Sequence, residues 1–117
     1  MSNPAEQALV EKALKSGLGG CVEWHPNSAD LVRRNMKLFG LTPEGIRKET
    51  IKHVQNGGNV HQLREARAEW KDERDYYYKV IIPMPDLFVK GLFVEIVFHD
   101  DDPDYPAILL VNAHEQK

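Results

Sequence analysis

The chain has 117 residues, of which 42% are hydrophobic and 28% are charged, and its formal net charge is −3 at pH 7. This length is typical of one domain, and the composition excludes a disordered chain, a collagen-like repeat and a disulfide-rich scaffold. The apolar run at residues 80–85 is far shorter than the roughly 20 residues that span a bilayer, so we expect no membrane partner. A lone Cys21 and an N-terminus without a basic, apolar leader predict a cytoplasmic protein.

Charge is distributed unevenly along the chain. Residues 31–74 contain ten Lys or Arg against six Asp or Glu, whereas residues 75–117 contain three Lys against eight acids. A basic segment of this kind attracts polyanions such as RNA. The same pattern also suits two solvated helical faces, so both interpretations stay open at this point.

The first predicted helix covers residues 4–16. Asn3 is its expected N-cap, Pro4 takes the first helical position and Glu6 completes a capping box. Apolar residues then recur at helical spacing until Gly17, where the helix ends. Because residues 17–20 contain three glycines, we expect residues 1–16 to be loosely attached to the rest of the domain.

Two further helices follow a short strand or extended entry at residues 21–24. The second helix is capped by Asn27 or Ser28 and ends at Gly40. The third helix begins at Thr42-Pro43, so a connection of about two residues predicts a helical hairpin. The apolar residues of the second helix fall at helical spacing and are expected to form one buried stripe: Leu31, Val32, Met36, Leu38 and Phe39.

This pair of helices is not expected to bind duplex DNA. The third helix offers the cations Arg47, Lys48 and Lys52. The acids Glu44 and Glu49 are interleaved with them, which leaves a weakly basic surface for a DNA backbone. Duplex DNA is therefore not among the expected partners.

The C-terminal part predicts a sheet. Residues 63–69 contain strong helix formers, so we expect a short exposed helix there, with a long polar loop as the alternative. Residues 76–82, 92–99 and 107–114 are rich in β-branched and aromatic residues and predict a three-stranded antiparallel sheet over residues 76–114. The expected fold is α+β, with N-terminal helices packed on a C-terminal antiparallel β-meander, in a single domain of residues 1–117.

Motifs for cofactors and metals are missing from the sequence. The glycine-rich residues 17–20 follow a helix and lack the lysine of a phosphate-binding loop. The acidic residues 100–104 lack the glycine and distal glutamate of a calcium-binding EF-hand loop and suit a solvated turn. We therefore expect no cofactor and no bound metal.

The predicted sheet also supplies the candidate site. Strand alternation places Glu95 and His99 on one face, and a suitable register adds His114 from the last strand. RNA cleavage without metal needs a base, an acid and a cation for the phosphate. We expect His99 and His114 to act as base and acid beside Glu95, although the same residues also suit an ordinary solvent-facing sheet. The expected phosphate-binding cations are Lys79, Arg64, Arg67 and Arg74.

Residues 23–114 carry a family pattern. Glu23-Trp24-His25-Pro26 precedes the second helix, residues 35–42 form its end, and Asn56-Gly57-Gly58-Asn59-Val60 ends the third helix before the strands. This order resembles the RelE-like (barnase–EndoU–colicin–RelE) superfamily, nearest to BrnT-type toxins and related uncharacterised small proteins. The resemblance implies a toxin-like domain that binds RNA, cleaves it without metal and is held by an antitoxin-like partner.

A second hypothesis also stays open. Residues 111–114 read Val-Asn-Ala-His, in place of the basic Ser-Ala-Arg end of the BrnT-type toxins. A separable first helix and an exposed sheet edge suit a non-enzymatic protein-interaction module, including a homo-oligomer.

Overall fold

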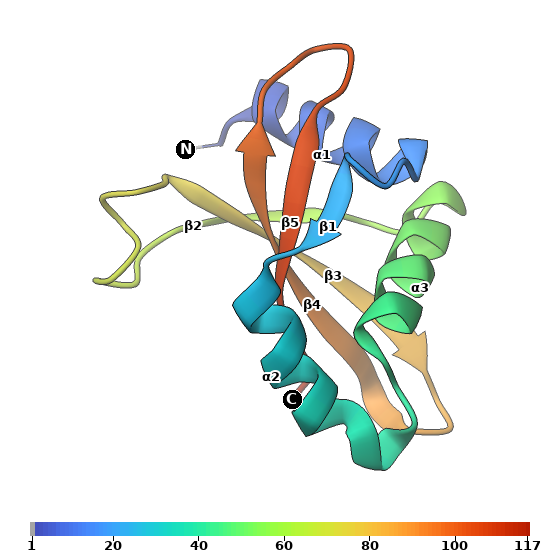
Figure 1. Ribbon diagram of the computed structural model, residues 1–117. Helices are drawn as coiled ribbons and strands as arrows, with labels where there is room; N and C mark the ends of the chain where they lie inside the picture. Colours follow the sequence, from blue (N-terminus) through green and yellow to red (C-terminus); the bar gives the residue numbers. More distant parts are fainter. Residues whose placement is uncertain (1) are drawn as a thin grey trace.

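Five strands form one mixed sheet in the order β1-β5-β4-β3-β2 (Figure 1). The computed structural model describes residues 2–117. Strands β2 to β5 pair antiparallel, whereas β1 runs parallel to β5. The predicted α+β class is confirmed, and β1 and β2 widen the expected three-stranded sheet on either side. The strands are β1 (Val22–Trp24), β2 (His61–Arg64), β3 (Tyr76–Met84), β4 (Phe88–Asp100) and β5 (Ala107–Glu115).

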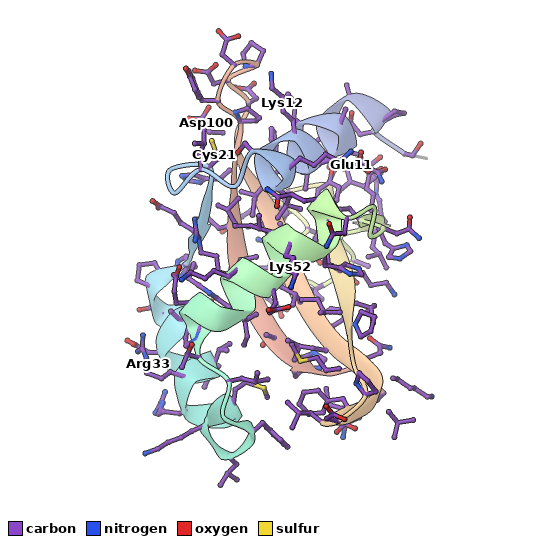
Figure 2. All side chains as sticks on the ribbon, turned by 90° about the vertical axis from the view of Figure 1, so that its right-hand side faces the viewer. Glu11, Lys12, Cys21, Arg33, Lys52 and Asp100 are labelled. Carbon is purple, nitrogen blue, oxygen red and sulfur yellow. The ribbon has the colours of Figure 1, made fainter. Side chains whose placement is uncertain are left out.

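Three helices precede most of the sheet: α1 (Pro4–Ser16), α2 (Pro26–Met36) and α3 (Pro43–Gln55). Each begins with a proline in its first turn, where the missing N–H costs no hydrogen bond. Helix α3 lies across one face of the sheet with α1 above it (Figure 2), and α2 packs against β5. No helix among the described residues is long and apolar enough to cross a bilayer.

The first helix is held more firmly than we expected. Asn3 accepts a hydrogen bond from the Glu6 N–H at 3.0 Å and Gly17 ends the helix with a φ of 65°, as predicted. However, α1 does not lie loosely, because the side chains of Val10, Ala13 and Leu14 are fully buried in the core. Helix α1 contacts both α3 and β5, so it belongs to the domain core.

The end of the second helix also differs from the prediction. Helix α2 begins at Pro26 and stops at Met36, and a single 3-10 turn, η1 (Lys37–Phe39), leads to Gly40 with a φ of 71°. The extra turn rotates the following side chains away from the core. Val32 and Met36 are buried as expected, whereas Leu31, Leu38 and Phe39 are exposed, so the predicted apolar stripe is wrong for these three.

Residues 61–75 form a strand and a loop, so the short helix expected over residues 63–69 is wrong, and the polar loop given as the alternative is found at residues 65–75. β2 takes the first four of these residues, and the loop from Glu65 to Asp75 follows in successive turns. The Arg67 guanidinium donates to the Glu65 carboxylate at 2.9 Å. Side chains two positions apart face away from each other on a helix, so this pair is incompatible with a helix at these residues.

The core lies between the sheet and helices α1 and α3. Alternate residues of β3, β4 and β5 point into it, among them Tyr78, Val94 and Leu110, which are fully buried. The Tyr78 hydroxyl donates to Glu6 at 2.8 Å and accepts from Gln62 at 2.7 Å. Burial raises the pKa of Tyr78 above its usual value. The other sheet face is left for the loop of residues 65–75, which lies on the side opposite α3 (Figure 1).

Candidate functional site

A row of polar side chains crosses the sheet face opposite α1 and α3, here called the open sheet face. His61 of β2 pairs with Lys79 of β3, Lys79 pairs with Glu95 of β4, and Glu95 pairs with Asn112 of β5. Directly paired residues share one sheet face, so these four side chains form a continuous line, here called the polar row. Glu95 is buried at its centre, with 6% of the residue exposed.

Arg67 connects the loop of residues 65–75 to the polar row. Its Nη1 and Nη2 donate to the two carboxylate oxygens of Glu95 at 3.2 and 2.8 Å. Its Nε and Nη2 donate to Glu65 at 2.9 Å, and its guanidinium carbon lies 4.7 Å from the centre of the Tyr77 ring. The two carboxylates raise the pKa of Arg67 further, so its charge is permanent.

Arg74 completes an arginine–glutamate network of Glu65, Arg67, Arg74 and Glu95. Its Nε donates to Glu65 at 2.9 Å, and its guanidinium carbon lies 4.9 Å from the Trp70 ring centre. The Glu65 side chain is fully buried. Hydrogen bonds from Arg67 and then Arg74 outweigh burial and hold the pKa of Glu65 below its usual value. Within residues 2–117, the terminal nitrogens of Arg74 have no hydrogen-bond partner.

The network borders a cavity of about 370 Å³, here called the sheet cavity. This volume lies in the range of small-molecule sites. The cavity is bounded by the loop of residues 65–75, by β4 and β5, and by the start of α2. Its lining residues are His25, Ser28, Arg67, Trp70, Glu73, Arg74, Glu95, Val97, Leu109, Val111 and Asn112.

His25 reaches the cavity because a proline follows it. Pro26 disfavours helical geometry for the residue before it, and His25 is extended at φ −63° and ψ 129°. Its backbone N–H donates to the Leu110 carbonyl at 3.0 Å, which fixes the start of α2 against β5. The imidazole makes no capping hydrogen bond to α2, and His25 lines the cavity.

A β-bulge shapes the opposite wall. Glu95 pairs with Asn112 and Ile96 pairs with Leu110, which leaves Val111 as an extra residue in β5. Bulges redirect side chains and often lie beside functional sites. Here both Val111 and Asn112 line the cavity.

The structure brings together some of the predicted site residues. Glu95, Arg67 and Arg74 meet at the cavity, and Lys79 lies beside Glu95 in the polar row. Arg64 lies apart from them: β2 alternation turns it to the helix-covered face, where it lies 5.5 Å from the Tyr76 ring.

The two predicted histidines do not meet. His114 pairs with Phe93 near the start of β4, and the two rings stack at 4.6 Å. His99 lies six positions further along β4, beside the turn to β5, which corresponds to roughly 20 Å at the rise of a strand. Adjacent antiparallel strands place the end of one strand beside the start of the next. His99 and His114 therefore lie at opposite ends of the pair and do not form a base and acid at one centre.

Sequence reasoning proposed three of the eleven lining residues for the site and missed eight, of which four supply an imidazole, a hydroxyl, an amide and an indole. His25 and Ser28 come from the start of α2, Asn112 comes from the bulge, and Trp70 comes from the polar loop. Trp70 could have been identified from the sequence, because a tryptophan in a polar segment with no predicted core contact suggests a binding site. Among the described residues, no group of three or more His, Cys, Asp or Glu side chains is placed to hold a metal ion.

Comparison with known proteins gives no relative: no protein-family model, no curated protein and no solved structure matches the chain. The chemistry of the sheet cavity is therefore derived from its own residues.

Proposed function

We propose that the protein binds RNA at the sheet cavity and cleaves it without a metal ion. The observation that carries this proposal is the convergence of Glu95, His25 and Arg74 on one cavity from three distant parts of the chain. A carboxylate, an imidazole and a guanidinium are the base, acid and cation that phosphodiester transfer requires. The resemblance of residues 23–114 to RelE-like nucleases supports the same activity.

The proposed reaction is an internal transfer at one phosphodiester. Glu95 accepts the proton of a ribose 2′-hydroxyl, and the 2′-oxygen attacks the adjacent phosphorus. The bond from phosphorus to the 5′-oxygen of the next nucleotide breaks, and His25 gives that oxygen a proton. The products are a 2′,3′-cyclic phosphate and a free 5′-hydroxyl.

The network assigns different tasks to its two arginines. Arg67 orients Glu95 by holding both of its oxygens, each of which keeps a second lone pair for the incoming proton. Arg74 is bound to Glu65 through Nε alone, which leaves its terminal nitrogens for the phosphate. Lys79, beside Glu95 in the polar row, adds a second positive charge. Arg67 is thus a positioning residue, and Arg74 is the phosphate ligand.

The test is cleavage of labelled single-stranded RNA in excess EDTA, with the product ends identified by mass. We expect cyclic-phosphate ends from the native protein and a loss of about 100-fold or more for His25→Ala and for Glu95→Gln. His99→Ala and His114→Ala serve as matched controls, since both side chains are exposed and outside the cavity. Full activity of folded His25→Ala, or no cleavage by the native protein on any single-stranded RNA of a mixed pool, contradicts the proposal.

A toxin-like nuclease also has to be inhibited in the cell that makes it. We therefore include an antitoxin-like protein partner in the proposal. The sheet cavity and the polar row lie on the open sheet face, where one partner can cover both. Addition of such a partner is expected to stop cleavage by the native chain.

A non-enzymatic interaction role is the second candidate, and one surface favours it. Leu38 and Val89 are 94% and 97% exposed, and both flank the contact between Phe39 and Phe88, whose ring centres lie 4.9 Å apart. The α2–α3 connection and the β3–β4 hairpin thus form one apolar end of the molecule (Figure 1). Exposed apolar patches often mark protein interfaces.

Self-association is the simplest use of this apolar end, and sedimentation measures it. A dimer that Leu38→Ser/Val89→Ser converts to monomer, while RNA remains uncut, favours the interaction role. A native monomer at all concentrations contradicts self-association through this end.

A further inference from the structure

Trp70 is a large aromatic residue that the fold keeps partly outside the core. It is 38% exposed and lies in the loop of residues 65–75, whose other side chains are mostly polar. Three backbone hydrogen bonds fix its backbone: its N–H donates to the Arg67 carbonyl at 3.0 Å, and its carbonyl accepts from the N–H groups of Glu73 at 2.9 Å and Arg74 at 3.1 Å. The indole is therefore pre-positioned at the edge of the sheet cavity.

Arg74 packs on this indole and is held in place by the Glu65 carboxylate. Its guanidinium carbon lies 4.9 Å from the Trp70 ring centre, and its Nε is held by the fully buried carboxylate of Glu65. The buried carboxylate leaves Arg74 little freedom to rotate away. An aromatic ring and the free end of a guanidinium consequently line the same cavity side by side.

From this arrangement we infer that Trp70 and Arg74 seat one unpaired nucleobase and the phosphate attached to it, which makes the substrate single-stranded RNA. The inference rests on the proposed function and names the substrate form that the same cavity takes. The base stacks on the indole and the phosphate binds the terminal nitrogens of Arg74. Ser28 and Asn112 add a hydroxyl and an amide for the polar edge of the base.

Base pairing excludes double-stranded RNA from the Trp70–Arg74 site. In a double helix the base faces are stacked on neighbours and the base edges are hydrogen-bonded, so neither reaches a ring at a cavity wall. A single strand exposes both, and base–aromatic stacking contributes comparably for every base. The Trp70–Arg74 site is therefore expected to prefer single-stranded over double-stranded RNA strongly, and to distinguish one base from another only weakly.

The two tryptophans of the chain allow a direct measurement. Trp24→Phe leaves Trp70 as the single tryptophan, and Trp70→Phe leaves Trp24, whose indole N–H donates to the Pro43 carbonyl on the core side. The probe is a 2′-O-methyl RNA 12-mer, which lacks the attacking hydroxyl and stays intact. Controls are the same backbone without bases and a duplex of the same sequence.

Single-stranded probe is expected to quench Trp70 in the Trp24→Phe protein and to leave Trp24 unchanged in the Trp70→Phe protein. Trp70→Leu is expected to weaken binding by about 5- to 100-fold, whereas Trp70→Phe keeps most of the affinity. The duplex and the base-free backbone are expected to bind at least tenfold more weakly.

Two results overturn the inference in distinguishable ways. If the single strand binds but neither quenches Trp70 nor responds to Trp70→Leu, the nucleobase seat is wrong and RNA binding elsewhere in the cavity survives. If no form of RNA binds the native protein, the proposed function fails together with the seat.

Discussion

Arg67 donates to both carboxylate oxygens of Glu95 across 28 positions of sequence, at 3.2 and 2.8 Å. One end of this contact lies in an irregular loop and the other in the central strand of the open sheet face. The contact therefore fixes the loop of residues 65–75 over the sheet and creates a wall of the sheet cavity. We therefore expect the stability of the fold to depend on this contact.

Removal of Arg67 is expected to destabilise the fold. Arg67→Ala leaves Glu95 without an ionic partner and leaves Glu65 with Arg74 alone, and an unpaired buried carboxylate is costly. Because 40% of the Arg67 side chain is exposed, we expect a loss of about 2–3 kcal/mol in the free energy of unfolding, measured by urea denaturation. Arg33→Ala, which breaks an exposed pair with Asp30, is the control and should cost less than about 1 kcal/mol. Equal losses in the two variants contradict the role of the network.

The depressed pKa of Glu65 predicts a loss of stability in acid. Arg67 and Arg74 favour the charged carboxylate in the folded protein, whereas the unfolded chain binds a proton near the ordinary value of 4.5. Glu65 thus stabilises the fold above that pH, and this contribution is lost as the pH falls through the lower pKa of the folded state. Urea midpoints between about pH 6 and pH 3 should fall less steeply for Glu65→Gln than for the native protein. Glu69→Gln, at an exposed position, should keep the native slope.

The raised pKa of Tyr78 predicts a loss of stability at alkaline pH. Burial raises its pKa, so the folded protein keeps the phenolic proton at a pH where the unfolded chain releases it. This contribution is complete below about pH 10 and is lost as the pH rises further. Tyr78→Phe should cost about 1–2 kcal/mol at neutral pH, because Glu6 and Gln62 lose their partner. The variant should also lose less stability than the native protein in alkaline urea titrations; a steeper fall is the contradicting result.

Two leucines test the packing of α1. Leu14 is fully buried on α1, whereas Leu38 is 94% exposed on η1. We expect Leu14→Ala to lower the free energy of unfolding by about 2–4 kcal/mol, because a cavity remains in the core. Leu38→Ala should change it by less than about 0.5 kcal/mol. A small effect of Leu14→Ala on calorimetric melting supports a loosely attached α1 and contradicts the packing described here.

Local signals in the sequence predicted the elements where the chain itself supplies the cap. Asn3 and Thr42 each accept a hydrogen bond from the backbone three residues on, and α1 and α3 begin there as expected. The three long strands were found from their β-branched and aromatic runs. In contrast, the α2 stripe failed at Leu31, which is exposed within α2, and again beyond Met36, where the 3-10 turn that carries Leu38 has no local sequence signature.

The candidate site was predicted less well, because it depends on contacts between distant segments. Glu95 and Arg67 were both named, but their pairing needs the sheet register and the irregular path of the loop. Helix propensity at residues 63–69 pointed to a regular element there, and the buried Glu65 carboxylate overrides it. The separation of His99 from His114, in contrast, followed from the antiparallel hairpin already predicted, since the turn between their strands fixes His99 near Ala107.

The parallel pairing of β1 with β5 has a consequence for synthesis on the ribosome. Val22 pairs with Ile108, so β1 leaves the ribosome more than 80 residues before β5, the strand with which it pairs. At about 5–20 residues per second, β1 waits roughly 4–17 seconds for this strand. During that interval Cys21 and Val22, both buried in the finished protein, are exposed to the cell. The nascent chain is therefore most vulnerable to misassembly at its N-terminal third, and the cavity wall at His25 is completed only when β5 arrives.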